Sequence, residues 1–286
     1  MNGRISSDIM DKLEGKGQKV AEKDKFASIA DSGKPNAGRI YDYLLGGNHN
    51  FEVDRMAADQ VVRLMPFFPK LCKLVRWFLG EAVRRLCEEG YTQFIDFASG
   101  LPTVDHIHQV APPGTKVIYS DIDPVTVAYG QEIIKDNPNV RYGVCPAQKP
   151  EELLNSPLVQ QFFDAKRKAA IGFNGVAYFL PDEKLQHSMK ILHDWAGKGS
   201  RLFLCDLGFE KTEIDTSSGK EMDALYQKIG QPIFPRVRKT LEALTRPWKL
   251  LEPGLQPLEE WVGVREAVAE QSRSEGFAMI GAILGK

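Results

Sequence analysis

The feature that most constrains this fold is a regular alternation of short apolar segments with amphipathic ones. Each apolar segment has the length and the β-branched and aromatic content of a buried strand, and segments with helical spacing separate them. The predicted strands are residues 91–98, 116–121, 139–144, 168–180 and 200–209. Strands that alternate with helices form a mostly parallel sheet covered by helices on both faces, so the sequence predicts an α/β fold.

Two regions flank this alternation. Apolar residues recur at helical spacing from Leu71 to Cys87, and Gly90 is placed to end that helix. Later in the chain, residues 247–254 and 276–286 both look extended. They predict an antiparallel pair of strands at the edge of the sheet.

Composition argues against several classes of function. With 37 basic and 38 acidic residues, the chain is not expected to bind a nucleic-acid backbone, and it lacks an apolar run long enough for a transmembrane helix. Its four cysteines form no CxxC pair and lie in apolar surroundings, which indicates free thiols in a reducing cytoplasm without a metal site. Residues 1–26 lack the apolar stretch of a secretory signal and are expected to be frayed or loosely helical.

The turn after the first predicted strand carries a nucleoside-binding pattern. In open α/β sheets, ligands bind at the carboxyl ends of the strands. Gly100 would let the backbone approach a ligand there, and Asp96 precedes this turn. Asp121 ends the second strand, where a carboxylate can accept hydrogen bonds from both ribose hydroxyls.

Two classes of cofactor compete for this pattern. A dinucleotide site requires GxGxxG, but the string here is ASGLPT (98–103), which lacks the first and third glycines. S-adenosylmethionine (SAM) has no phosphate and needs one acid before the glycine-containing turn and one after the second strand. Asp96 and Asp121 therefore favour SAM, although either residue alone could simply cap a turn.

A longer stretch of the sequence bears on the choice between these two classes of cofactor. The segment NAGRIYDYLLGGNHNFEVDRMAADQV (36–61), followed by FIDFASGLPT, VIYSDIDPV and YFLPDE, closely resembles a family of bacterial SAM-dependent methyltransferases, many of them from actinobacteria. The resemblance extends from about Pro35 to Gly263. It implies a class I, Rossmann-like methyltransferase fold with a seven-stranded sheet that contains one antiparallel strand. We expect an N-terminal extension with a helical cofactor lid over residues 1–65 and the methyltransferase domain over 66–286.

The resemblance also implies site residues in the core. Asp96, Ala98 and Gly100 would lie beside the methionine part of SAM. Asp121 would contact the ribose and Ile122 the adenine, and Asn174 would face the sulfonium.

In the N-terminal signature, the expected cofactor-binding residues are Tyr41, Asp42, Gly46, Gly47 and Asn50. The two glycines would allow close approach or unusual backbone angles. The ring of Tyr41 or Tyr43 could stand against the sulfonium, a contact worth about 0.5–2 kcal/mol. A helix–turn packing element is the alternative interpretation of this segment.

The chain departs from the family at three positions. Ala98 replaces a glycine, Pro146 replaces an acid for the adenine amino group, and Tyr178 stands where many relatives have histidine. Tyr178 and His108 are the catalytic candidates, and His108 matches a family histidine. His106 and His49 are further candidates for a general base, and Phe67, Trp77, Tyr226 and Phe234 for an acceptor pocket.

These patterns predict a SAM-dependent methyltransferase for an unidentified small molecule, with neither nucleic acid nor membrane as a partner. A non-catalytic SAM-binding module and an enzyme that uses SAM for other chemistry are the alternatives. A nicotinamide-dependent dehydrogenase is more remote, and a homo-oligomer is compatible with the sequence.

Overall fold

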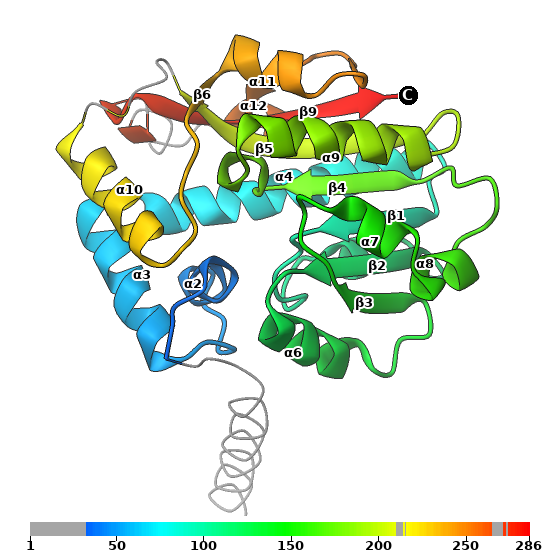
Figure 1. Ribbon diagram of the computed structural model, residues 1–286, viewed down its shortest axis with the longest axis horizontal. Helices are drawn as coiled ribbons and strands as arrows, with labels where there is room; N and C mark the ends of the chain where they lie inside the picture. The colour runs from blue at the N-terminus through cyan, green and yellow to red at the C-terminus, as the bar shows by residue number, and fades with distance from the viewer. Residues whose placement is uncertain (1–32, 210–213, 215, 265–270, 273) are drawn as a thin grey trace, which may run out of the picture.

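The computed structural model describes residues 33–209, 214, 216–264, 271–272 and 274–286 (Figure 1). The segment 1–26, predicted to be frayed or loosely helical, lies outside these residues.

A mostly parallel sheet forms the centre of the molecule (Figure 1). Its strands run in the order β3-β2-β1-β4-β5-β9-β7, while β6 pairs with β5 and β8 with β9. The strands are β1 (Gln93–Phe97), β2 (Lys116–Asp121), β3 (Val140–Val144), β4 (Ala170–Asn174), β5 (Arg201–Phe209), β6 (Arg236–Val237), β7 (Lys249–Leu250), β8 (Gln256–Pro257) and β9 (Phe277–Gly285). The described part of the chain thus has nine strands, where seven were expected. The difference comes from β6 and β8, which are two-residue pairings beside the main order.

The last strand gives the sheet its antiparallel member. β9 pairs with β5 over nine residues, from Arg201 opposite Gly285 to Phe209 opposite Phe277. It also pairs with β7 in the antiparallel sense, which confirms the predicted late pair. β7 contributes only two residues, so most of the backbone pairing of β9 is with β5. β9 lies between β5 and β7, and its apolar residues are buried on both faces of the sheet.

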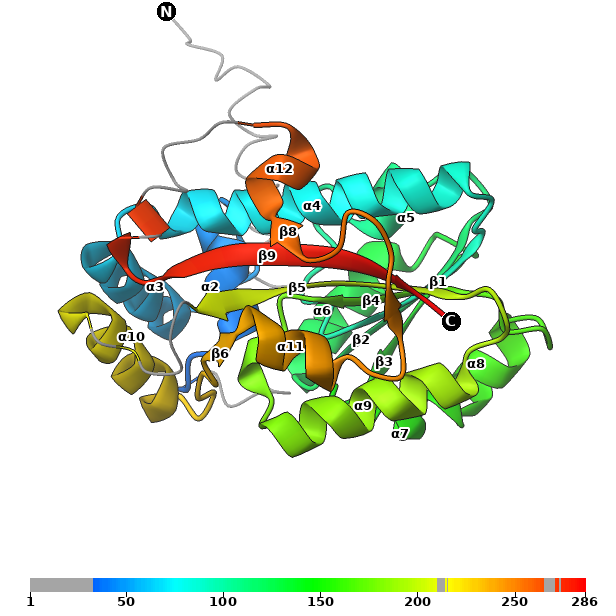
Figure 2. The ribbon, with the colours of Figure 1, turned by 90° about the horizontal axis from the view of Figure 1, so that it is seen from above.

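Helices cover both faces of the sheet, as Figure 2 shows. One face carries α4 (Phe68–Glu88), α5 (Ile107–Val110), α6 (Pro124–Ile134) and α12 (Leu258–Val262). The other carries α7 (Pro150–Leu154), α8 (Pro157–Phe162), α9 (Asp182–Trp195) and α11 (Arg238–Leu244). None of the helices in the described residues is long and apolar enough to cross a membrane.

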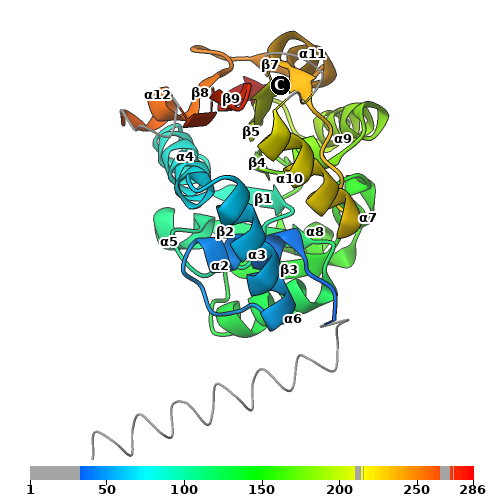
Figure 3. The same cartoon turned by 90° about the vertical axis from the view of Figure 1, so that its left-hand side faces the viewer.

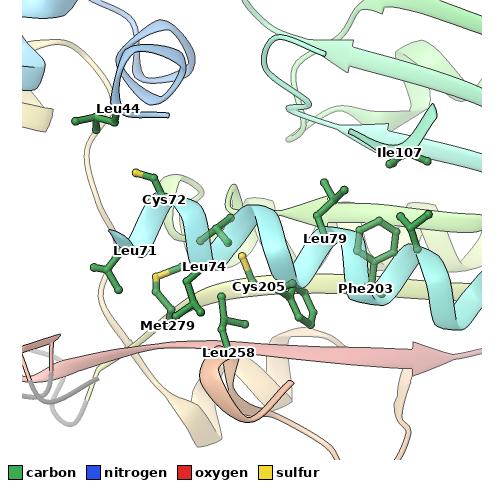
Figure 4. Packing of buried hydrophobic residues seen from close by; sticks show 14 of the residues in the cluster. Leu44, Leu71, Cys72, Leu74, Leu79, Ile107, Phe203, Cys205, Leu258 and Met279 are labelled. Atoms are coloured by element: carbon green, nitrogen blue, oxygen red, sulfur yellow. The ribbon is translucent and has the colours of Figure 1, made fainter. Parts of the chain in front are cut away.

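The helix predicted around residues 71–87 is observed as α4, and Gly90 beyond its end has φ +85°. Its buried side chains pack between the sheet and the N-terminal helices. In Figure 4, Cys72 of α4 and Leu44 project from facing sides of neighbouring helices, and Met279 of β9 approaches from the sheet. α4 is therefore the packing centre of this face.

The fourth predicted strand is shorter than expected. It ends at Asn174, because Gly175 adopts φ +72° and turns the chain. The apolar residues that follow form a 3₁₀ helix, η1 (Ala177–Phe179), instead of continuing the strand.

Three helices stand at the carboxyl ends of the parallel strands: α2 (Ala37–Leu44), α3 (Glu52–Leu64) and α10 (Ser217–Lys228) (Figure 3). α2 contacts α3 and α4, and α10 contacts α3. The side chain of Gln231 accepts a hydrogen bond from the backbone N–H of Ala37 (2.7 Å), which ties the segment after α10 to the start of α2.

Candidate active site

A cavity of about 370 Å³ opens between these helices and the carboxyl ends of β1, β2, β4 and β5. Its volume lies within the range of small-molecule sites, which is about 300–1,000 Å³. The predicted site residues that line it are Tyr41, Asp96, Ala98, Gly100, Asp121, Ile122, Asn174 and Tyr178.

The loop after β1 is fixed by its neighbours. The hydroxyl of Tyr142 donates to the carbonyl of Gly100 (2.5 Å), and the hydroxyls of Ser99 and Ser120 both donate to the carbonyl of Asp96. Asp121 accepts hydrogen bonds from the backbone N–H groups of Gly100 (3.1 Å) and Asp123 (2.9 Å). The two sequence-predicted acids therefore flank one rigid loop.

Both acids are buried, and burial changes their protonation. It raises the pKa of Asp96 to about 7 and that of Asp121 to about 6. The Oδ1 atom of Asp96 has no hydrogen-bond partner within the described structure. A buried, unsatisfied carboxylate in a cavity is a natural acceptor for a ligand's cationic or hydroxyl group.

Ala98 adopts a backbone conformation that favours glycine. Its φ is +54°, in the left-handed region, and it lines the cavity. A residue with a Cβ pays about 1–2 kcal/mol for this conformation. The alanine at this position is therefore strained.

The N-terminal segment 36–61 contains residues that line the cavity and residues that form a turn outside the cavity lining. Tyr41 lines the cavity, and its hydroxyl donates to the carbonyl of Cys72 (2.9 Å). Asp42 instead accepts from the backbone N–H of His49 (2.9 Å) and the side-chain amide of Asn50 (3.0 Å).

The turn explains its two glycines. Gly46 has φ +86°, and a Cβ on Gly47 would lie 2.2 Å from Oδ1 of Asp42. The cavity lining does not include Asp42, Gly46, Gly47 or Asn50. Their contacts shape the turn between α2 and α3.

Arg39 of the same signature was missed by the sequence reasoning. Its Nε donates to Asp54 (2.8 Å), its Nη1 to Asp123 (2.7 Å) and its Nη2 to the carbonyl of Lys34 (2.8 Å). Asp123 lies two residues after Asp121, so this buried ion pair joins α2 to the turn that carries the expected ribose acid.

Comparison with known proteins identifies the family. The sequence matches the family described as S-adenosyl methyltransferase over residues 23–284. The chain belongs to this family. It is thus a SAM-dependent methyltransferase, and SAM is its cofactor. Among curated proteins, none matches it.

Solved structures share its architecture. A candidate methyltransferase from Thermobifida fusca YX is 28% identical, with a TM-score of 0.79, and the match covers 91% of this chain and 97% of that one. A DUF574 family protein from Streptomyces avermitilis MA-4680 is 26% identical, with a TM-score of 0.79 and coverage of 90% and 99%. Geranyl diphosphate C-methyltransferase from Streptomyces coelicolor A3(2), crystallised with S-adenosyl-L-homocysteine, is 12% identical, with a TM-score of 0.50 and coverage of 85% and 83%, and shows a shared fold only.

The catalytic candidates of this methyltransferase are placed differently. Tyr178 lines the cavity, and burial raises its pKa well above the ordinary value. His108 lies outside the cavity lining, where its Nδ1 is 2.9 Å from the hydroxyl of Tyr119.

The two remaining histidine candidates, His49 and His106, also lie outside the cavity lining of the methyltransferase. The ring of His106 caps α5 by accepting from the backbone N–H of Ile107 (3.0 Å), and its Nε2 contacts the carbonyl of Ser99 (3.0 Å). His49 packs edge-on against Tyr129. Their proximity along the chain to the cofactor loop therefore does not place them at the cavity.

The part of the cavity between α10 and β9 is mostly apolar, although Glu275, which accepts a hydrogen bond from the hydroxyl of Ser218, also lines it. Tyr226 lines it as predicted, whereas Phe67, Trp77 and Phe234 are not among the lining residues. The apolar side chains come from α2, α4, α10, β5 and β9: Leu44, Phe68, Leu71, Leu207, Phe209, Met222, Phe277 and Met279.

Near Ile122, the residue expected beside the adenine, the sequence indicated Pro146 but not Gln148. Both line the cavity with Ile122, which is 54% exposed. Arg76 of α4 was missed as well, and it lines the cavity although it is buried. An arginine within an otherwise apolar helical pattern gave no sequence signal of its own, because its burial depends on tertiary packing.

Proposed function

We propose that this methyltransferase transfers the methyl group of SAM to a small, largely apolar molecule. The observation that carries the proposal is one continuous cavity that joins the Asp96–Asp121 loop to the apolar end between α2, α4, α10 and β9. An anionic acceptor would lose its hydration at that end without finding a cation among the described lining residues there, where Glu275 is itself an acid, whereas an apolar acceptor would gain by burial.

The residues around the loop fit SAM. Asp121 is proposed to accept hydrogen bonds from the ribose hydroxyls, and Ile122 to pack against the adenine. Ala98 and Gly100 would bring backbone groups to the methionine part, with Asp96 beside its ammonium group. Asn174 at the end of β4 would face the sulfonium. The unpartnered Oδ1 of Asp96 supports this orientation, because it offers an anion where a cationic group is expected.

We further propose that residues 1–65 form an extension whose helices α2 and α3 close over the cofactor, and that 66–286 form the methyltransferase domain. Tyr41 at the cavity and the ion pair between Arg39 and Asp123 support a lid of this kind. Asp42, Gly46, Gly47 and Asn50 would serve the lid by shaping its turn.

Tyr178 is proposed to orient the acceptor, since its ring lies at the cavity beside Gly175. When bound, SAM supplies an electrophilic methyl group: the acceptor atom bonds to the methyl carbon, the carbon–sulfur bond breaks, and S-adenosylhomocysteine leaves. Catalysis then depends mainly on holding the reacting atoms about 3–3.5 Å apart. His108 is a weaker candidate, because its ring is engaged by Tyr119.

We also expect the enzyme to work in the bacterial cytoplasm, without nucleic acid as a partner. The four cysteines are free, and three of them are buried, as suits a reducing compartment.

The test is a screen for S-adenosylhomocysteine formation with paired acceptors that differ only in an added carboxylate. We expect the apolar member of each pair to be methylated and the charged member to be poor. Met222→Gln, which places an amide in the apolar end, should raise the KM for the acceptor and leave the affinity for S-adenosylhomocysteine unchanged. Met56→Gln is the matched control, because Met56 is 62% exposed on α3. Preference for the charged members would contradict the apolar acceptor, and methylthioadenosine as the product would contradict methyl transfer.

A further inference from the structure

Arg76 is an unusual residue in the wall of the cavity. Only 7% of its surface is exposed, yet its Nε and Nη1 atoms have no hydrogen-bond partner among the described residues. Arg76 forms no ion pair with any other described residue, and its guanidinium lies 5.5 Å from the ring centre of Tyr41. A buried cation without an anion is costly, so this side chain is expected to have a partner in the working enzyme.

Asp96 lines the same cavity. It is 2% exposed, and its Oδ1 is also without a partner. Arg76 is close enough to favour the charged form of Asp96 electrostatically, but the two residues form no direct salt bridge within the described chain. A buried anion and a buried cation thus lie near each other, and each has side-chain atoms without a hydrogen-bond partner.

This arrangement matches one chemical group of the cofactor. The α-amino-acid end of SAM carries an ammonium and a carboxylate on the same carbon, so it needs an anion and a cation side by side. A guanidinium binds a carboxylate through two parallel N–H donors, and two donors of Arg76 are available.

We propose that Arg76 binds the α-carboxylate of SAM while Asp96 binds its α-ammonium group, which presupposes SAM as the cofactor of this cavity. The nearest groups agree with this assignment. Arg76 interacts electrostatically with Asp96, His106 and Tyr119 around the loop after β1, with Tyr41 of α2 and with Cys72 on its own helix. Its charge therefore acts on the part of the cavity where the methionine end of SAM is proposed to lie.

The experiment measures how each protein distinguishes SAM from decarboxylated SAM by calorimetric titration. Decarboxylated SAM keeps the nucleoside, the sulfonium and the amine and lacks only the carboxylate. The wild-type enzyme should bind SAM about 10- to 100-fold more tightly, as expected for a charge-assisted hydrogen-bonded pair. In Arg76→Gln this preference should largely disappear through weaker SAM binding, while affinity for decarboxylated SAM and for methylthioadenosine is retained.

Asp121→Asn is the matched control, because the loss of a ribose contact should weaken all three ligands by similar factors. Equal affinities of the wild-type enzyme for SAM and decarboxylated SAM would overturn the inference without any variant having to fold. A preference that survives in Arg76→Gln would also overturn it. If the wild-type enzyme bound none of the three ligands, the cofactor site itself would be wrong, which is a different result.

Discussion

Replacing Arg39 by methionine tests whether the N-terminal helices are held to the turn after β2. The substitution keeps most of the side-chain volume and removes three hydrogen bonds, to Asp54, Asp123 and the carbonyl of Lys34. Arg39 is 2% exposed and Asp54 is fully buried, so the variant leaves a buried carboxylate without its cation.

The structure gives the expected magnitude. Breaking a buried ion pair by removing one partner costs about 3–5 kcal/mol. Asp54 keeps the backbone N–H groups of Asn36 and Phe51 as donors, and Asp123 keeps the hydroxyl of Thr126. We therefore expect the lower end of the range, about 3 kcal/mol of lost unfolding free energy.

Urea denaturation and hydrogen exchange measure this effect. The urea midpoint should be lower in Arg39→Met than in the wild-type protein. The substitution should also accelerate hydrogen exchange more for the amides of α2 than for those of β1. Arg84→Met is the matched control, because Arg84 is 57% exposed in its pair with Glu81 and should cost less than about 1 kcal/mol. If both variants lose the same small amount, the ion pair does not hold α2 in place, and the reasoning fails.

Three further predictions concern the loop after β1. Asp121→Ala should weaken SAM binding at least about tenfold, measured by calorimetry, because a charged acceptor for the ribose is lost; an unchanged affinity would contradict its assignment. Ala98→Gly relieves the strain of a positive φ, and the gain of about 1–2 kcal/mol exceeds the extra unfolded-state entropy of about 0.4–1 kcal/mol, so the urea midpoint should rise; a lower midpoint would show that the methyl group packs favourably. Burial raises the pKa values of Asp96 to about 7 and Asp121 to about 6, so the native state binds more protons than the unfolded state above about pH 4. This contribution to stability should be largest below pH 4 and lost as the pH rises to about 7. Denaturation of the ligand-free enzyme should therefore give lower stability at pH 8 than at pH 6 and at pH 6 than at pH 5, and no contribution of these acids over this range would mean that both are ionised throughout.

Local sequence patterns predicted the sheet well because strand and helix periodicity reflect burial directly. They failed where one residue changed the direction of the chain. The apolar run after Asn174 read as a continued strand, but the backbone of Gly175 turns it into a 3₁₀ helix. The small strands β6 and β8 escaped notice because two-residue pairings leave no periodic pattern.

The site was predictable in part for a related reason. Asp96 and Asp121 lie at the carboxyl ends of β1 and β2, and these ends meet at one edge of a parallel sheet, so their approach to one cavity followed from topology. The direction of a side chain on a helix or turn could not be predicted from topology in the same way. Asp42 turns away from the cavity that its neighbour Tyr41 lines, and His108 faces Tyr119. The burial of Arg76 arises only when helices distant in sequence pack together.

Asp123 connects two events that would otherwise be separate. Its backbone N–H holds Asp121, and its carboxylate holds Arg39 of α2. The nucleoside proposed to bind at Asp121 and the position of α2 would thus act on the same turn, and equilibrium coupling between two such sites is reciprocal. Any factor by which bound SAM favours the docked position of α2 is also the factor by which docked α2 tightens SAM, so losing the docked helix would weaken SAM binding even with Asp121 itself unchanged.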